Sequence, residues 1–100
     1  TFAASIETLL ATLTGGDVTT ALIMGAADNG NAATYTMQDY ADALRASAVA
    51  EGYAMFDALL LLGSYADADA RGVYDDVSHI GNVAGRIICG VAVDELLTVL

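Results

Sequence analysis

The chain has 100 residues, enough for one small domain, and we expect a single helical domain over residues 1–100. Three arginines, no lysine and thirteen acidic residues give a formal net charge of -10, which disfavours direct nucleic-acid binding because phosphate contacts need clustered basic side chains. The lone Cys89 excludes an internal disulfide framework, and no uncharged apolar run is long enough to predict a membrane span.

Residues 2–13 are predicted to form an amphipathic helix. Thr1 is a good N-cap, and Gly15-Gly16 offers a left-handed stop. The apolar side chains recur at helical spacing along one stripe: Phe2, Ile6, Leu9, Leu10 and Leu13.

Residues 18–27 allow two local structures. A cap at Asp17 and the shared face of Val18, Ala21 and Leu22 favour a helix, which is the preferred prediction. The alternative is a strand over 18–24 that pairs with residues 33–36 in a hairpin around Asn29-Gly30.

Residues 36–63 carry the strongest helical signal. Thr36 and Asp39 are spaced as a capping box, and an apolar stripe follows with a small phase shift close to Gly52. This pattern predicts either one long helix to about Gly63 or two helices broken near Gly52.

Two further expectations concern side chains of this same segment. Asp42 and Arg45 are spaced to pair on the outer helix face. Leu59–Leu62 covers all sides of a helical turn, and each exposed leucine forgoes roughly 1.5–3 kcal/mol of burial. The run therefore predicts burial on every side, either within the chain's own fold or with one side against another subunit.

The last third of the chain begins with a polar segment, 64–72, that is typical of a loop or a frayed helix end. Apolar residues then recur at steps of three and four from Val73 to Val91, which predicts a helix with Asp75 and Asp76 in its first turn. The alternative is a buried strand near 86–93, followed by a short helix over 94–100.

Together these segments predict a mostly α fold, a small bundle of about four helices. The absence of proline permits long helices. The alternative is an α+β fold with a hairpin near 18–36 and a strand near 86–93.

The acidic segment that begins at Asp67 partly matches a calcium loop. Such a loop wants oxygen ligands at alternate positions and glycine at position 6. The fifth position is the cationic Arg71 and the twelfth is Ser78, so the match is weak. We expect no metal site and no cofactor, and the weak candidates for a hard cation are Asp67, Asp69 and Asp75.

His79 and Cys89 are the only histidine and cysteine. Ten positions along one straight helix correspond to about 15 Å, too far for the imidazole to activate the thiol. We therefore assign no catalytic residue. Cys89 is expected to be a small buried hydrophobe, and His79 a residue of a helix surface or an interface.

Apolar residues make up 56% of the chain, more than a lone small domain is expected to hide. We expect a self-assembling structural subunit of a homo-oligomer, of the coat, filament or scaffold type. The alternatives are a helical binding module for an apolar small molecule and, third, a weak calcium-binding protein or a small enzyme. The expected interface residues are Leu59, Leu61, Leu62 and the helix-crossing pair Gly81 and Gly85.

Overall fold

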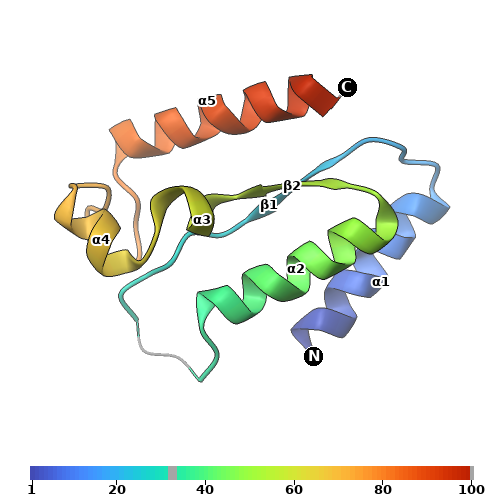
Figure 1. Ribbon diagram of the computed structural model, residues 1–100, viewed down its shortest axis with the longest axis horizontal. Helices are drawn as coiled ribbons and strands as arrows, with labels where there is room; N and C mark the ends of the chain where they lie inside the picture. The colour runs from blue at the N-terminus through green and yellow to red at the C-terminus, as the bar shows by residue number, and fades with distance from the viewer. Residues whose placement is uncertain (32–33, 100) are drawn as a thin grey trace.

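The computed structural model describes residues 1–31 and 34–99. These residues form five helices and a small parallel sheet of two strands, so the mostly α prediction is confirmed. Figure 1 shows the strands between two helical layers, with α5 on one side and α1 and α2 on the other. None of the described helices has the length and apolarity needed to cross a bilayer.

Helix α1 (Phe2–Gly15) confirms the first predicted helix. The hydroxyl of Thr1 accepts a hydrogen bond from the Ala4 amide, as expected of an N-cap. The predicted left-handed glycine stop is wrong, because Gly16 has φ -90° and Asp17 takes the positive φ of 62° instead. Aspartate tolerates this conformation better than most residues, so the chain turns one position later.

Strand β1 (Leu22–Gly25) replaces the helix that was preferred over 18–27, so that prediction is wrong. The strand alternative was correct for this segment, but its partner is β2 (Ala54–Asp57), in parallel register from Leu22 opposite Ala54. Thr34–Thr36 forms no strand, and Ala33 lies outside the described residues. Parallel strands need a long crossover, which helix α2 supplies between them.

Helix α2 (Met37–Glu51) begins with the predicted capping box of Thr36 and Asp39. It ends at Gly52, which adopts the left-handed conformation with φ 76°. The predicted break at Gly52 is therefore confirmed. Beyond it the chain forms β2 and the short helix α3 (Ala58–Leu62) rather than a second long helix.

Asp57 explains why the chain changes structure after β2. Its carboxylate accepts from the Leu60 amide at 2.9 Å and so caps α3. It also pairs with Arg45, so the predicted pair between Arg45 and Asp42 is wrong. Asp42 instead accepts a hydrogen bond from Gln38. The ion pair with Asp57 fixes α2 to the end of β2.

Residues 64–99 differ from the sequence prediction over their central part. Helix α4 (Tyr65–Ala70) is capped by Ser64, and residues 71–81 form a loop where a helix from Val73 was expected. Helix α5 (Asn82–Val99) then runs through the predicted strand near 86–93, so that alternative is wrong. Ile88 and Ala92 are buried while Gly90 between them is exposed, as one helical face allows, whereas a strand would place all three on the same face.

Each face of the sheet packs against a separate hydrophobic core. Ile23 and Met55 pack toward α1 and α2 around the buried Leu10, Ala48 and Tyr53. Leu22 and Phe56 pack toward α5, together with Leu62, Ala68, Tyr74, Ile88 and Ala92. This alternation along each strand is the period-two pattern of a sheet covered on both faces.

The leucine run is only partly buried in the single chain. Leu62 faces the core, but Leu60 is 78% exposed and Leu61 49% exposed. Burial on all sides by the chain's own fold is therefore wrong. Packing of this side against another subunit stays a prediction.

Adjacent leucines of α1 provide a stability test of this packing. Leu10 is 2% exposed and Leu9 is 53% exposed. We expect Leu10→Ala to lower the free energy of unfolding by about 2–5 kcal/mol, because it leaves a cavity in the α1–α2 core. Leu9→Ala, the matched control, should cost less than about 1 kcal/mol. Urea denaturation measures both, and equal losses would contradict the packing described.

Candidate functional site

Two loops meet beyond the carboxyl end of β1. The loop that follows β1 donates from the Gly30 amide to the Val77 carbonyl at 2.8 Å. The side-chain amide of Asn31 donates to the Ser78 hydroxyl, also at 2.8 Å. These contacts bring residues 75–80 to the side of the sheet where the strands have their carboxyl ends. In α/β proteins, ligands bind on this side.

Asp28 anchors this junction on its other side. Its carboxylate accepts from the Tyr65 amide at 2.9 Å, and its carbonyl accepts from the Tyr74 hydroxyl. Burial, and then the nearby charge of Asp28, raise the pKa of Tyr74, so the phenol stays protonated and able to donate. A Cβ at Gly30 would lie 2.8 Å from the Tyr65 ring, so the junction closes only around glycine there.

The loop over 73–81 closes on itself and presents its tip to solvent. The Gly81 amide donates to the Val73 carbonyl, and the Asp75 amide donates to the His79 carbonyl, both at 2.8 Å. Tyr74 and Ile80 form an antiparallel bridge below the tip. This fold of the backbone places the side chains of Asp76 and His79 together.

The Asp76 carboxylate organises the tip. One of its oxygens accepts from the backbone amides of Ser78 at 2.8 Å and His79 at 2.9 Å. Nδ1 of His79 lies 2.8 Å from that oxygen and 2.9 Å from the other. The Ser78 amide and then the His79 side chain hold the pKa of Asp76 below its ordinary value.

This contact fixes the protonation pattern of His79. An ionised carboxylate only accepts hydrogen bonds, so Nδ1 carries the proton and Nε2 of the neutral ring keeps its lone pair. The side chain is 75% exposed, and Nε2 has no hydrogen-bond partner among the described residues. The ring can therefore accept a proton from a group that approaches from solvent. Catalytic triads contain the same contact between an acid and an imidazole, together with a nucleophile on the other ring nitrogen.

This pair is absent from the site residues that the sequence predicts. The helix expected from Val73 would carry both Asp76 and His79, and that helix is wrong because residues 71–81 form a loop. The expected exposure of His79 is confirmed, and its place in an interface stays a prediction. The missed signal is an aspartate followed by serine and histidine at the second and third positions, a spacing that lets a carboxylate cap its own turn. Cys89 is exposed on α5, so its predicted burial is also wrong.

The residues proposed for metal binding lie on two elements. Asp67 and Asp69 are on α4, and Asp75 is in the loop before α5. Within residues 1–31 and 34–99, no three histidine, cysteine or acidic side chains are grouped as metal ligands.

The expected interface residues are also divided. Leu59, Leu61 and Leu62 are on α3. Gly81 precedes α5 and fits against Asp75, where a Cβ would lie 2.9 Å from the carboxylate. Gly85 is on α5 and faces open space, so the two glycines do not share a helix surface.

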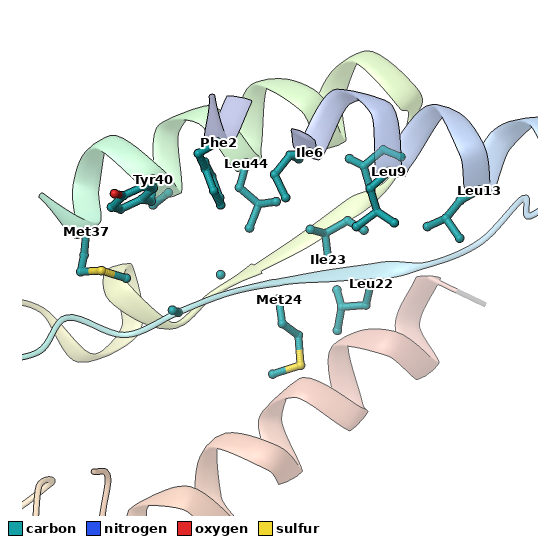
Figure 2. Close-up of a pocket in the computed structure, with 14 residues that line it drawn as sticks. Phe2, Ile6, Leu9, Leu13, Leu22, Ile23, Met24, Met37, Tyr40 and Leu44 are labelled. Carbon is teal, nitrogen blue, oxygen red and sulfur yellow. The ribbon is translucent and has the colours of Figure 1, made fainter. Parts of the chain in front are cut away.

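A second feature is an apolar groove, here called the β1 groove, between α1, β1 and the start of α2. Its volume is about 440 Å³. Figure 2 shows Phe2, Ile6, Leu9 and Leu13 reaching from α1 toward the space beside β1. Its other lining residues are Leu10, Leu22, Ile23, Met24, Gly25, Ala26, Met37, Tyr40, Ala41 and Leu44, and none is charged.

Comparison with known protein families, with curated proteins and with solved structures found no match to this chain. Its function is therefore inferred from the chemistry of the residues themselves.

The pH dependence of the tip depends on Asp76. Because folding lowers the pKa of this carboxyl below its ordinary value of 3.8, the stabilisation that it gives is complete at neutral pH. It should be lost as the pH falls through the lowered pKa. Carboxyl-carbon NMR titration should show a pKa of Asp76 below its ordinary value, and an ordinary pKa would contradict the capped turn.

The tautomer of His79 gives a sharper test. At pH 8, nitrogen NMR should show a proton on Nδ1 and a bare Nε2. Asp76→Asn should shift the ring toward the opposite tautomer, because an amide oxygen holds the Nδ1 proton less strongly than a carboxylate. Asp75→Asn is the matched control, since no hydrogen bond joins Asp75 to the imidazole among the described residues, and it should leave the tautomer unchanged.

Proposed function

We propose that Asp76 and His79 act as the orienting acid and the general base in the hydrolysis of an ester. The observation that carries this proposal is the contact of both Asp76 oxygens with Nδ1, while Nε2 stands exposed at the carboxyl end of the sheet. Geometry of this kind prepares an imidazole for proton transfer.

The proposed step begins when a water molecule reaches Nε2. The imidazole takes a proton from this water as the water oxygen bonds to the ester carbonyl carbon. The imidazolium then returns that proton to the leaving alcohol as the carbon–oxygen bond breaks. Asp76 stays ionised throughout and stabilises the charged ring.

The charge of the chain narrows the substrate class. A net charge of -10 repels anions, and the Asp76 carboxylate lies beside the base. A neutral or cationic ester is therefore favoured over an ester that carries a free carboxylate or phosphate group.

Hydrolysis of p-nitrophenyl acetate tests the proposal. His79→Ala should reduce the rate to the buffer background. Asp76→Asn should reduce it about tenfold or more, because the ring loses its orientation. Asp75→Asn should keep the rate of the unmodified chain. A rate that survives His79→Ala would contradict the proposal.

Self-association is a second candidate function, and a separate observation supports it. The outer face of α5 exposes Val83, Ile87 and Leu97, and α3 exposes Leu60 and Leu61. Several exposed apolar side chains on one helix face are typical of a surface that binds a partner protein. A structural subunit of a homo-oligomer is the form that this second proposal takes.

Light scattering after size exclusion tests self-association. The chain should elute as a defined multimer at micromolar concentration. Leu61→Asp and Ile87→Asp should reduce the multimer while circular dichroism stays unchanged, because both side chains are exposed in the single chain. Glu7→Gln, on the exposed face of α1, is the control. A compact monomer of 10.2 kDa would exclude this function without affecting the ester test.

A further inference from the structure

Each strand of the two-stranded sheet has one outer edge without a strand partner among the described residues. Among the described residues, β1 pairs only with β2, so the main-chain groups on its other edge lack a strand partner. Natural edge strands are protected by charges, proline or short length. β1 is short, but Leu22-Ile23-Met24-Gly25 has neither of the other protections.

Apolar hollows flank this edge on both faces of the sheet. On one face is the β1 groove, which α1 covers (Figure 2). On the other face a smaller hollow of about 250 Å³ lies between β1 and α5. Leu22 and Met24 line both hollows, and the remaining lining of the second is Cys89, Ala92, Val93 and Leu96. No charged side chain lines either one.

An unpaired strand edge with an apolar hollow on each face favours one kind of ligand, an extended peptide strand. A β-strand pairs its backbone with an edge while its side chains alternate between the two faces. A lipid or a flat aromatic molecule would fill one hollow and leave the amides of β1 unpaired. A second copy would bring its own α1 and α5, which flank its β1, to this edge, whereas a lone strand brings only its own side chains to the two hollows.

The length and charge of the occupant can be inferred from the same surface. Helix α1 has 14 residues, about 21 Å at 1.5 Å per residue, and about six strand residues cover that length. A charged segment would have to lose its hydration in uncharged hollows. We propose that the free edge of β1 binds an uncharged, aliphatic β-strand of about four to six residues from a partner polypeptide.

A labelled peptide tests the proposal on the intact chain. The probe is Gln-Val-Leu-Val-Ile-Gln-amide with a fluorophore on its amino terminus, and the control peptide carries proline in place of the second valine. Fluorescence anisotropy should show saturable binding of the first peptide alone. Hydrogen exchange within Leu22–Gly25 should slow when the peptide binds.

Substitutions place the peptide at this edge. Leu9→Lys, in the α1 cover, and Met24→Lys, on β1, should each raise the Kd tenfold or more. Both side chains are about half exposed, so the fold should tolerate the changes. Leu97→Lys, an exposed apolar position that lines neither hollow, is the matched control and should leave the Kd unchanged.

Three results would overturn the proposal. The first is no saturable binding at millimolar peptide. The second is binding that neither Leu9→Lys nor Met24→Lys weakens. The third is a stable dimer that Met24→Lys dissociates, which would make a second copy the occupant. None of these results bears on ester hydrolysis, which depends on His79.

Discussion

The two-stranded parallel sheet has to be buried on both faces, and this requirement sets the positions of the long helices. Ile23 and Met55 point to one helical layer, while Leu22 and Phe56 point to the other. A lone pair of strands has little stability in water, so the helices supply most of the apolar contact. Because α2 must connect two parallel strands, it lies across one face and leaves the other to α5 (Figure 1).

The same arrangement of sheet and helices positions Asp76 and His79. The loop that leaves β1 is held by Asp28 and Gly30, and the loop that enters α5 is held against it. Asp76 and His79 therefore stand on a tip that several hydrogen bonds support, although both side chains are exposed. An exposed ion pair adds little stability by itself. Its value here is orientation, because the carboxylate decides which imidazole nitrogen carries the proton.

The free edge of β1 and the loop that carries His79 are related through the direction of the strands. In a parallel sheet the carboxyl ends of all strands meet at the same side. A strand that joined β1 in parallel would end on the side where the His79 loop lies. The proposed docking and the proposed hydrolysis thus concern the same side of the sheet, while their tests stay separate.

Features that depend on neighbouring residues could be predicted from the sequence. The capping box of Thr36 and Asp39, the cap at Thr1 and the turn at Gly52 are local backbone contacts. The helical content could be predicted from apolar periodicity, and the apolar excess predicted incomplete burial. The candidate site could not be found in this way, because Asp76 and His79 fit the polar side of a helical pattern equally well.

The choice between strand, helix and loop depended instead on contacts across the fold. Leu22–Gly25 has no polar side chain, and such a segment can be either a buried helix or a strand. Pairing with β2, which begins at Ala54, decided for the strand. Residues 73–81 left the helical path because Tyr74 and Gly30 bind partners far along the chain. Local spacing offered the strand only as an alternative over 18–24 and the turn at Asp76 only as a capping pattern. The long-range contacts that decided both leave no signal in local spacing.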